Sequence, residues 1–290
     1  MHGAGLGPPH PGAAPASHAL RALLDGVPAA ALPLTDRGFR YGDGLFETLR
    51  IAAGEPVWWD AHLARLARGC SVLGLAMPEA SRLAAELRQL CGSDDGVLRL
   101  ALTRSDAAHG YAPQTGEVRR VMTFHPGPGP DPAAAGLAIG WATLQLGIQP
   151  RLAGLKHLNR LEQVLAAAER RDAGLDELLL CDADGAVTSA IAANLFLVRG
   201  GRLETPLIDR CGVAGTCRQW ILDAHPECRV LRLQRGDVEA ADELFLCNSV
   251  RGILPVARLG PRALPAGPVT QALQRRLGTA VPAFAAEPER

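Results

Sequence analysis

The chain has 290 residues, and its 30 basic residues balance 30 acidic ones without a long run of either sign. This composition gives no electrostatic reason to expect nucleic acid or an anionic membrane as partner, so a small molecule is the expected one. Seven cysteines without a CxxC pair argue against a disulfide framework and a zinc ribbon, and no stretch resembles a signal peptide or the ~18 apolar residues of a membrane helix. We therefore expect a cytoplasmic protein without a bound metal.

The first half of the chain has the pattern of an α+β unit. Residues 1–18 are rich in Gly, Pro, Ala and His and lack apolar periodicity, which predicts a disordered extension. The rest of this half, residues 19–125, forms the predicted amino-terminal domain. In chain order it contains a hairpin with its turn at Asp25 and Gly26, strands over 45–51 and 57–59 joined at Ala53 and Gly54, helices over 62–75 and 80–92, and strands over 97–105 and 119–125.

A proline- and glycine-rich segment separates this unit from a strand-rich second half. Four prolines and three glycines within residues 125–136 predict an interdomain linker, which we assign to 126–134. The predicted carboxy-terminal domain spans 135–290. It begins with a strand over 136–146 and continues with a helix over 157–174, whose apolar stripe is Leu158, Leu161, Val164, Leu165 and Ala168. Further strands over 176–206, a glycine turn at 211–216, a helix and a strand within 241–256 follow.

Lysine usage is the most unusual feature of the composition. The chain contains 29 arginines and a single lysine, Lys156, just before the predicted helix. Arginine cannot lose its proton in a protein, whereas a lysine amine can become a neutral nucleophile that forms an imine with a carbonyl compound. Composition alone leaves a solvated surface lysine as an equal alternative.

The turn GVAGTCR, residues 212–218, has the pattern of an anion site. A glycine-containing turn before a helix directs free backbone N–H groups and the positive end of the helix dipole toward a ligand. The signal is weak by itself, because many connections look the same. No GxxxxGK[ST] run is present, so we expect a smaller phosphate compound than a nucleotide.

Four segments in order resemble the fold-type IV enzymes that depend on pyridoxal 5′-phosphate (PLP), a group of branched-chain and D-amino-acid aminotransferases and 4-amino-4-deoxychorismate lyases. The segments are DRGFRYGDGLFETLR (36–50), HLARL (62–66), LKHLNRLEQVLAAAE (155–169), and a block from DELLLCDADGAVTSAIAANLF through GVAGTCRQ to LFLCNSVRGILPV. The resemblance covers most of residues 20–256. It implies an α/β fold with a smaller amino-terminal α+β domain, a larger carboxy-terminal strand-rich α/β domain, and PLP in the cleft between them.

The resemblance also implies roles for individual residues. Lys156 matches the lysine that forms a Schiff base with PLP and later moves the substrate proton. Arg65 matches the arginine that holds the cofactor phosphate. Thr216 and Cys217 match positions whose backbone amides bind that phosphate, and Ser249 matches a further phosphate contact. Without the resemblance, Arg65 reads as a solvated helix arginine and Ser249 as an ordinary turn residue.

Ser189 departs from the family pattern. The family usually has a glutamate five residues before the asparagine of the NLF run, here Asn194, where it pairs with the pyridine nitrogen of PLP. A hydroxyl cannot keep that nitrogen protonated as a carboxylate does, so the ring becomes a weaker electron sink. Transamination depends on that sink more than an elimination does, so Ser189 favours a lyase.

Within the group, the run KHLNRLEQVLA and the CNS tripeptide resemble the 4-amino-4-deoxychorismate lyases. The likeness implies a homodimer that converts 4-amino-4-deoxychorismate to 4-aminobenzoate, a folate precursor, and pyruvate. The alternatives are a branched-chain or D-amino-acid aminotransferase and a non-catalytic PLP-binding relative. The substrate has two carboxylates, and the candidates to bind them are Arg40, Tyr41, Arg104, Tyr111 and Arg251.

Overall fold

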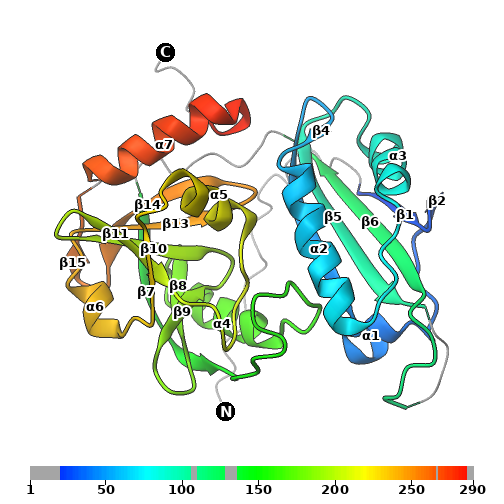
Figure 1. The fold of residues 1–290 in the computed structure, drawn as a ribbon, viewed down its shortest axis with the longest axis horizontal. Helices are drawn as coiled ribbons and strands as arrows, with labels where there is room; N and C mark the ends of the chain where they lie inside the picture. Colours follow the sequence, from blue (N-terminus) through cyan, green and yellow to red (C-terminus); the bar gives the residue numbers. More distant parts are fainter. Residues whose placement is uncertain (1–19, 106–109, 128–135, 266, 286–290) are drawn as a thin grey trace, which may run out of the picture.

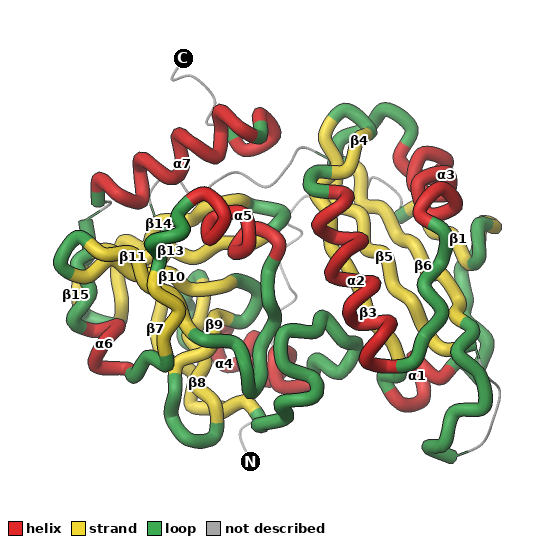
Figure 2. The backbone as a smooth tube through the Cα atoms, viewed as in Figure 1, coloured by secondary structure: helices red, strands yellow, loops and turns green. Residues whose placement is uncertain are grey.

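A computed structural model describes residues 20–105, 110–127, 136–265 and 267–285. The chain forms two sheets side by side, one from each half of the sequence (Figures 1 and 2). The mixed α/β architecture agrees with the predicted fold class. The predicted extension over 1–18 and residues 128–134 of the predicted linker lie outside the described residues.

The first sheet is antiparallel and has six strands in the order β2-β1-β6-β5-β3-β4. Their bounds are β1 Arg21–Leu24, β2 Val27–Pro28, β3 Gly44–Ala52, β4 Glu55–Pro56, β5 Gly96–Arg104 and β6 Val118–Pro126. Both predicted turns are present, with positive φ at Asp25 and Gly26 (52° and 85°) and at Ala53 and Gly54 (50° and 78°), as two-residue hairpin turns require.

Three helices complete this half: α1 Arg37–Tyr41, α2 Trp59–Leu73 and α3 Ala80–Cys91. Apolar residues of α2 and α3 form one core with β3, β5 and β6, and Figure 1 shows both helices beside this sheet. The predicted strand over 57–59 is wrong. Trp58 adopts left-handed angles (φ 56°, ψ 38°) and ends the extended chain, so that Trp59 begins α2. The Trp58 ring packs 5.1 Å from that of Phe284 in the other half, a tertiary contact that strand propensity does not include.

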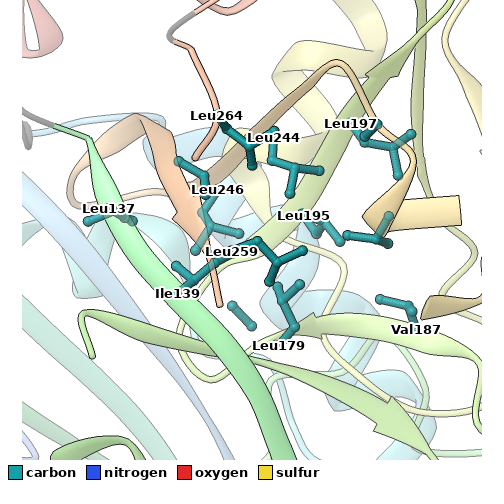
Figure 3. Packing of buried hydrophobic residues seen from close by; sticks show 14 of the residues in the cluster. Leu137, Ile139, Leu179, Val187, Leu195, Leu197, Leu244, Leu246, Leu259 and Leu264 are labelled. Atoms are coloured by element: carbon teal, nitrogen blue, oxygen red, sulfur yellow. The ribbon is translucent and has the colours of Figure 1, made fainter. Parts of the chain in front are cut away.

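The second sheet has nine strands in the order β12-β11-β10-β13-β14-β7-β8-β9, with β15 paired to β14. Their bounds are β7 Leu137–Leu146, β8 Glu177–Asp182, β9 Val187–Ala190, β10 Asn194–Arg199, β11 Arg202–Pro206, β12 Arg229–Leu231, β13 Glu243–Asn248, β14 Gly252–Leu259 and β15 Arg262–Ala263. Leucine, isoleucine and valine side chains from six of these strands meet in one buried cluster (Figure 3).

The helices of the second half are α4 Leu161–Asp172, α5 Thr216–Ala224, α6 Arg235–Glu239, α7 Pro268–Ala280 and the 3₁₀ helix η1 Pro282–Phe284. The predicted stripe on α4 does not face a core, since Leu161, Val164 and Leu165 are 77%, 60% and 60% exposed. Instead Ala166 packs against β8. Helix α4 also begins later than predicted, because residues just after Lys156 pair with β3.

Hydrogen bonds between residues far apart in sequence join the two halves. The Phe46 N–H donates to the Lys156 carbonyl over 2.8 Å, and the Ser249 hydroxyl donates to the Thr48 carbonyl over 2.9 Å. Residues of β3 thus contact both the Lys156 segment and the turn after β13, and a cavity lies where these segments meet.

Candidate functional site

The cavity has a volume of about 510 Å³, and both halves of the chain line it. Five residues singled out in the sequence meet here: Lys156, Arg65, Ser189, Thr216 and Ser249. They come from five separate segments, so the structure brings together most of the predicted cofactor site.

Lys156 lines this cavity beside the aromatic ring of Phe46. Its Nζ is 4.4 Å from the centroid of the Phe46 ring, and its carbonyl accepts a hydrogen bond from β3. Burial, together with the positive charge of Arg65, lowers the pKa of Lys156 from its ordinary value of 10.5 to about 7. The negative charge of Glu47 opposes this shift. The amine is therefore largely neutral and nucleophilic slightly above neutral pH.

This lowered pKa predicts how fast the cofactor-free protein captures an aldehyde. A protonated amine does not attack a carbonyl, so the rate of covalent reaction with PLP should rise with pH and level off above about pH 8, with its midpoint near 7. Stopped-flow absorbance of the apoprotein mixed with PLP measures this profile. A rate that keeps rising toward pH 10 would show that Lys156 has the pKa of an ordinary lysine.

Arg65 occupies the cavity wall as part of a buried cluster. Its Nε donates to Glu47 Oε1 over 2.8 Å, a second nitrogen bonds Oε2, and Nη1 donates to the Ala214 carbonyl over 3.1 Å. His62 Nδ1 lies 2.6 Å from Glu47 Oε2. Burial acts to raise the pKa of Glu47, but the hydrogen bonds from Arg65 and His62 outweigh it and leave that pKa below its usual value. Glu47 is thus ionised and holds Arg65 in position.

The start of α5 forms another wall. Thr216 is the first residue of this helix, and its Oγ1 is buried without a hydrogen-bond partner in the described part of the chain. The free N–H groups of the first turn and the unsatisfied hydroxyl together make an anion site. Arg65 lines the same cavity and supplies a positive charge.

The loop before α5 is held tightly enough to keep these donors in place. Asn194 Nδ2 donates to the Val213 carbonyl over 2.9 Å, and Gly154 exchanges backbone hydrogen bonds with Gly212 and Ala214. A β-carbon on Gly215 would lie 2.1 Å from Asn194 Oδ1, so no side chain fits there. The glycine is required by this close approach, whereas the sequence indicated only a turn.

Cys217 is not among the residues that line the cavity. Its side chain is fully buried and packs in the core with α7, so only its backbone N–H remains available for the predicted contact. Burial raises the pKa of the Cys217 thiol well above its usual value. Its side chain is therefore a neutral packing group.

The five candidates for binding substrate carboxylates do not line this cavity either. Arg104 is buried and bonded to Asp43 and to three backbone carbonyls. The rings of Tyr41 and Tyr111 lie 5.6 Å apart, and Arg40 donates to the Tyr41 hydroxyl over 2.8 Å. Tyr111 is 87% exposed. The Arg251 N–H donates to Asn248 Oδ1 over 2.8 Å. Their assignment to the substrate stays a prediction.

Sequence reasoning missed two other arginines that do line the cavity, Arg99 on β5 and Arg160 just before α4. It also missed Glu47 and His62 as partners of Arg65, although Glu47 stands in the quoted segment LFETLR. The lining contains Arg65, Arg99, Lys156 and Arg160 and, in the described ranges, no Asp or Glu. This cavity therefore suits a ligand with several negative charges.

Ser189 lines the cavity from β9, where it pairs with Leu180 of β8. Its side chain is buried and carries no charge. Since no carboxylate belongs to the lining in the part of the chain that the structure describes, a bound heterocycle would meet a hydroxyl here. The serine that replaces the family's usual glutamate therefore lies in the cavity itself.

The cavity lies between the two sheets and contains a nucleophilic amine with a lowered pKa and an anion site at a helix start. These features define a class of enzyme that holds a phosphorylated carbonyl cofactor on lysine. The chain belongs to the amino-transferase class IV family, whose model matches residues 44–259. It is 31% identical to aminodeoxychorismate lyase of Vibrio harveyi over 269 residues, which cover 88% of this chain and 99% of that protein.

Two solved structures illustrate the similarity. The 4-amino-4-deoxychorismate lyase of Pseudomonas aeruginosa is 40% identical, with a TM-score of 0.83 over 90% of this chain and 99% of that one. An aminotransferase of Brucella abortus bound to the cofactor PLP is 22% identical, with a TM-score of 0.78 over 92% and 99%. The latter likeness shows the fold alone.

The family depends on PLP, and the residues present fit that cofactor. The buried Thr216 Oγ1 has no hydrogen-bond partner among the residues that the structure describes, as expected of a group that bonds a phosphate, and Lys156 is the only lysine in the chain. No group of three or more acidic, His or Cys side chains suited to a metal occurs among the described residues. Nor does any described helix have the length and hydropathy to cross a membrane.

Proposed function

We propose that this protein is a PLP-dependent lyase that converts 4-amino-4-deoxychorismate to 4-aminobenzoate and pyruvate. The observation that carries the proposal is the charge of the cavity: one lysine and three arginines without an acidic lining residue in the described ranges. This balance suits a phosphate together with a substrate that has two carboxylates. The 40% identity to the Pseudomonas aeruginosa lyase supports the same choice.

In this proposal the chain's own groups bind the ligands and move one proton. Bound PLP supplies an electron sink that is conjugated to the substrate nitrogen. Arg65 and Thr216 would hold the phosphate, and Ser249 would add a contact if its hydroxyl turned away from the Thr48 carbonyl. Lys156, neutral above about pH 7, would accept the proton from the ring carbon. Phe46 packs near the amine and keeps its environment apolar. The enolpyruvyl group would then leave as the enolate of pyruvate with the electrons of the broken carbon–oxygen bond, and the ring would become aromatic. The proton taken up by Lys156 balances the one that the enolate gains to become pyruvate.

The test supplies 4-amino-4-deoxychorismate to the purified holoenzyme and follows 4-aminobenzoate by fluorescence-detected chromatography and pyruvate by a coupled dehydrogenase. We expect the two products in equal amounts. Rapid exchange of an amino acid with 2-oxoglutarate and no 4-aminobenzoate would instead identify an aminotransferase. Turnover of neither substrate by protein that holds PLP would identify a non-catalytic relative.

A substitution at Ser189 tests why a lyase is favoured. In Ser189→Glu a carboxylate faces the pyridine nitrogen and keeps it protonated, so slow transamination of glutamate should accelerate by roughly tenfold or more, the factor that one pKa unit represents. Conversion of the bound cofactor to its amine form, followed by absorbance, measures the rate. Ser189→Gln is the neutral control of the same size. Equal rates for the two variants would contradict the argument.

We further propose a cytoplasmic homodimer. Leu161, Val164 and Leu165 form an exposed apolar strip on α4, and Val164 also lines the cavity, so a second copy that covers the strip would help to close the site. Light scattering after size-exclusion chromatography should give twice the 30.5 kDa mass, and Leu161→Glu with Leu165→Glu should give the monomer. A monomeric wild-type protein would exclude the dimer.

The seven free cysteines suit a reducing cytoplasm.

A further inference from the structure

Two arginines besides Arg65 line the Lys156 cavity, Arg99 and Arg160. Arg65 is bonded to Glu47 and lies near the helix start that receives the phosphate. Arg99 extends from β5 of the first sheet, and Arg160 precedes α4 in the second half. Both line the same cavity as Lys156, and the positive charge of each lowers the pKa of that lysine. They are therefore close enough to the reacting amine to contact a substrate attached there.

Among the described residues, neither guanidinium lies within ion-pair distance of a carboxylate, although the charge of Glu162 acts on Arg160. Arg160 Nε donates to the His157 carbonyl over 2.8 Å, but its Nη2 is buried without a partner. Burial lowers the pKa of Arg160 to about 10, although the negative charge of Glu162 acts in the opposite direction. Arg99 lies 3.8 Å from the centroid of the Phe46 ring, where the rim of the cavity leaves it exposed.

Two other arginines of this protein are paired with carboxylates. Arg65 and Arg104 are buried more deeply than the half-buried Arg160, and they form ion pairs with Glu47 and Asp43. A buried cation that lacks such a partner destabilises the free protein, so its retention in a cavity points to a partner supplied by a ligand. Near Arg160, Gln163 Oε1 is likewise buried without a partner, and amide rotation would offer a bound carboxylate an N–H donor instead.

We propose that Arg99 and Arg160 each bind one of the two carboxylates of the substrate. This inference rests on the proposed function and names the residues that select a dianionic substrate over a simple amino acid. A guanidinium presents two parallel N–H donors that match a carboxylate, and two of them at separate points of one cavity fix both the position and the orientation of the ring. Phe46, which underlies both Arg99 and Lys156, offers an apolar surface between them.

The test measures binding by the holoenzyme and does not require turnover. The probes are 3-(carboxymethoxy)benzoate, which carries both carboxylates in an arrangement like that of the substrate, and the two single-carboxylate compounds 3-methoxybenzoate and phenoxyacetate. Isothermal titration calorimetry gives each dissociation constant for the wild type and for Arg99→Gln and Arg160→Gln. Arg171→Gln is the matched control, because Arg171 lies on α4 with its side chain 75% exposed and paired to Asp172.

We expect each of the two cavity substitutions to weaken the dianion by roughly 10- to 100-fold, the range for a lost charge-assisted hydrogen bond. Each should weaken one single-carboxylate probe and leave the other within about twofold, and the two variants should differ in which probe they lose. Arg99→Lys and Arg160→Lys should recover part of the affinity. The control should bind all three probes like the wild type.

The proposal is overturned if the wild type does not prefer the dianion, if neither substitution weakens it, or if both variants lose the same probe. Thermal unfolding of each variant shows whether a loss reflects misfolding; in that case the lysine variants decide the outcome. Failure of the proposed function is seen separately. If the protein binds the dianion as expected but yields no 4-aminobenzoate, the carboxylate-binding roles of Arg99 and Arg160 stand and the lyase function is wrong.

Discussion

Lys156→Ala should abolish covalent attachment of PLP and lower the rate of 4-aminobenzoate formation by roughly 10²- to 10⁴-fold or more, the range for removal of a positioned acid–base group. The same substitution also removes the nucleophile that holds the cofactor. After borohydride reduction, mass spectrometry should find one pyridoxyl adduct in the wild type and none in the variant. Because the chain has a single lysine, the position of the adduct is unambiguous.

The apolar contact between Lys156 and the Phe46 ring suggests a control for this experiment. Lys156→Met keeps most of the apolar volume, so it should fold like the wild type and remain unable to form the adduct. A small primary amine added at high concentration should restore part of the activity of Lys156→Ala by supplying the missing base. An adduct that persists in both variants, or activity equal to the wild type, would remove the chemical role assigned to this residue.

Arg65→Ala is expected to have the second largest effect, on both stability and cofactor affinity. The substitution leaves the Glu47 carboxylate buried without its main partner, which should cost about 3–5 kcal/mol of unfolding free energy. It also removes a cation from the phosphate side of the cavity, so affinity for PLP should fall by roughly 10- to 100-fold. Urea unfolding of the apoprotein and titration with PLP measure the two effects separately.

Arg120→Ala is the matched control for Arg65→Ala. Arg120 is a partly buried arginine in the same half, with its side chain 12% exposed and paired with Glu86 over 2.9 Å, and it does not line the cavity. It should lower the stability in a similar way and leave the affinity for PLP unchanged. Arg65→Lys should recover part of that affinity, since the single charge of an ammonium group partly replaces the paired N–H donors of the guanidinium. Undiminished affinity in Arg65→Ala would mean that Thr216 and the helix start bind the phosphate without it.

Much of the fold was predictable because its signals are local. The hairpin turns at Asp25 and Ala53 follow from short-range backbone preferences, and the strands follow from alternating or continuous apolar runs. The local signal failed where a distant contact decided the outcome. Trp58 has high strand propensity, yet it packs against Phe284 and turns the chain into α2. The stripe on α4 has helical periodicity, but periodicity does not say which face is covered.

By itself the sequence determined that Lys156 is the chain's single lysine and that it lies in one of the ordered segments that carry the family resemblance, which together make it the candidate reactive amine. Only the tertiary structure decided that Arg99 and Arg160 share a cavity with that amine and that Glu47 and His62 hold Arg65. It also decided the depressed pKa of Lys156. Burial and Coulomb interactions depend on distances between groups that lie up to about a hundred residues apart in the chain, and residue types in a row do not contain those distances.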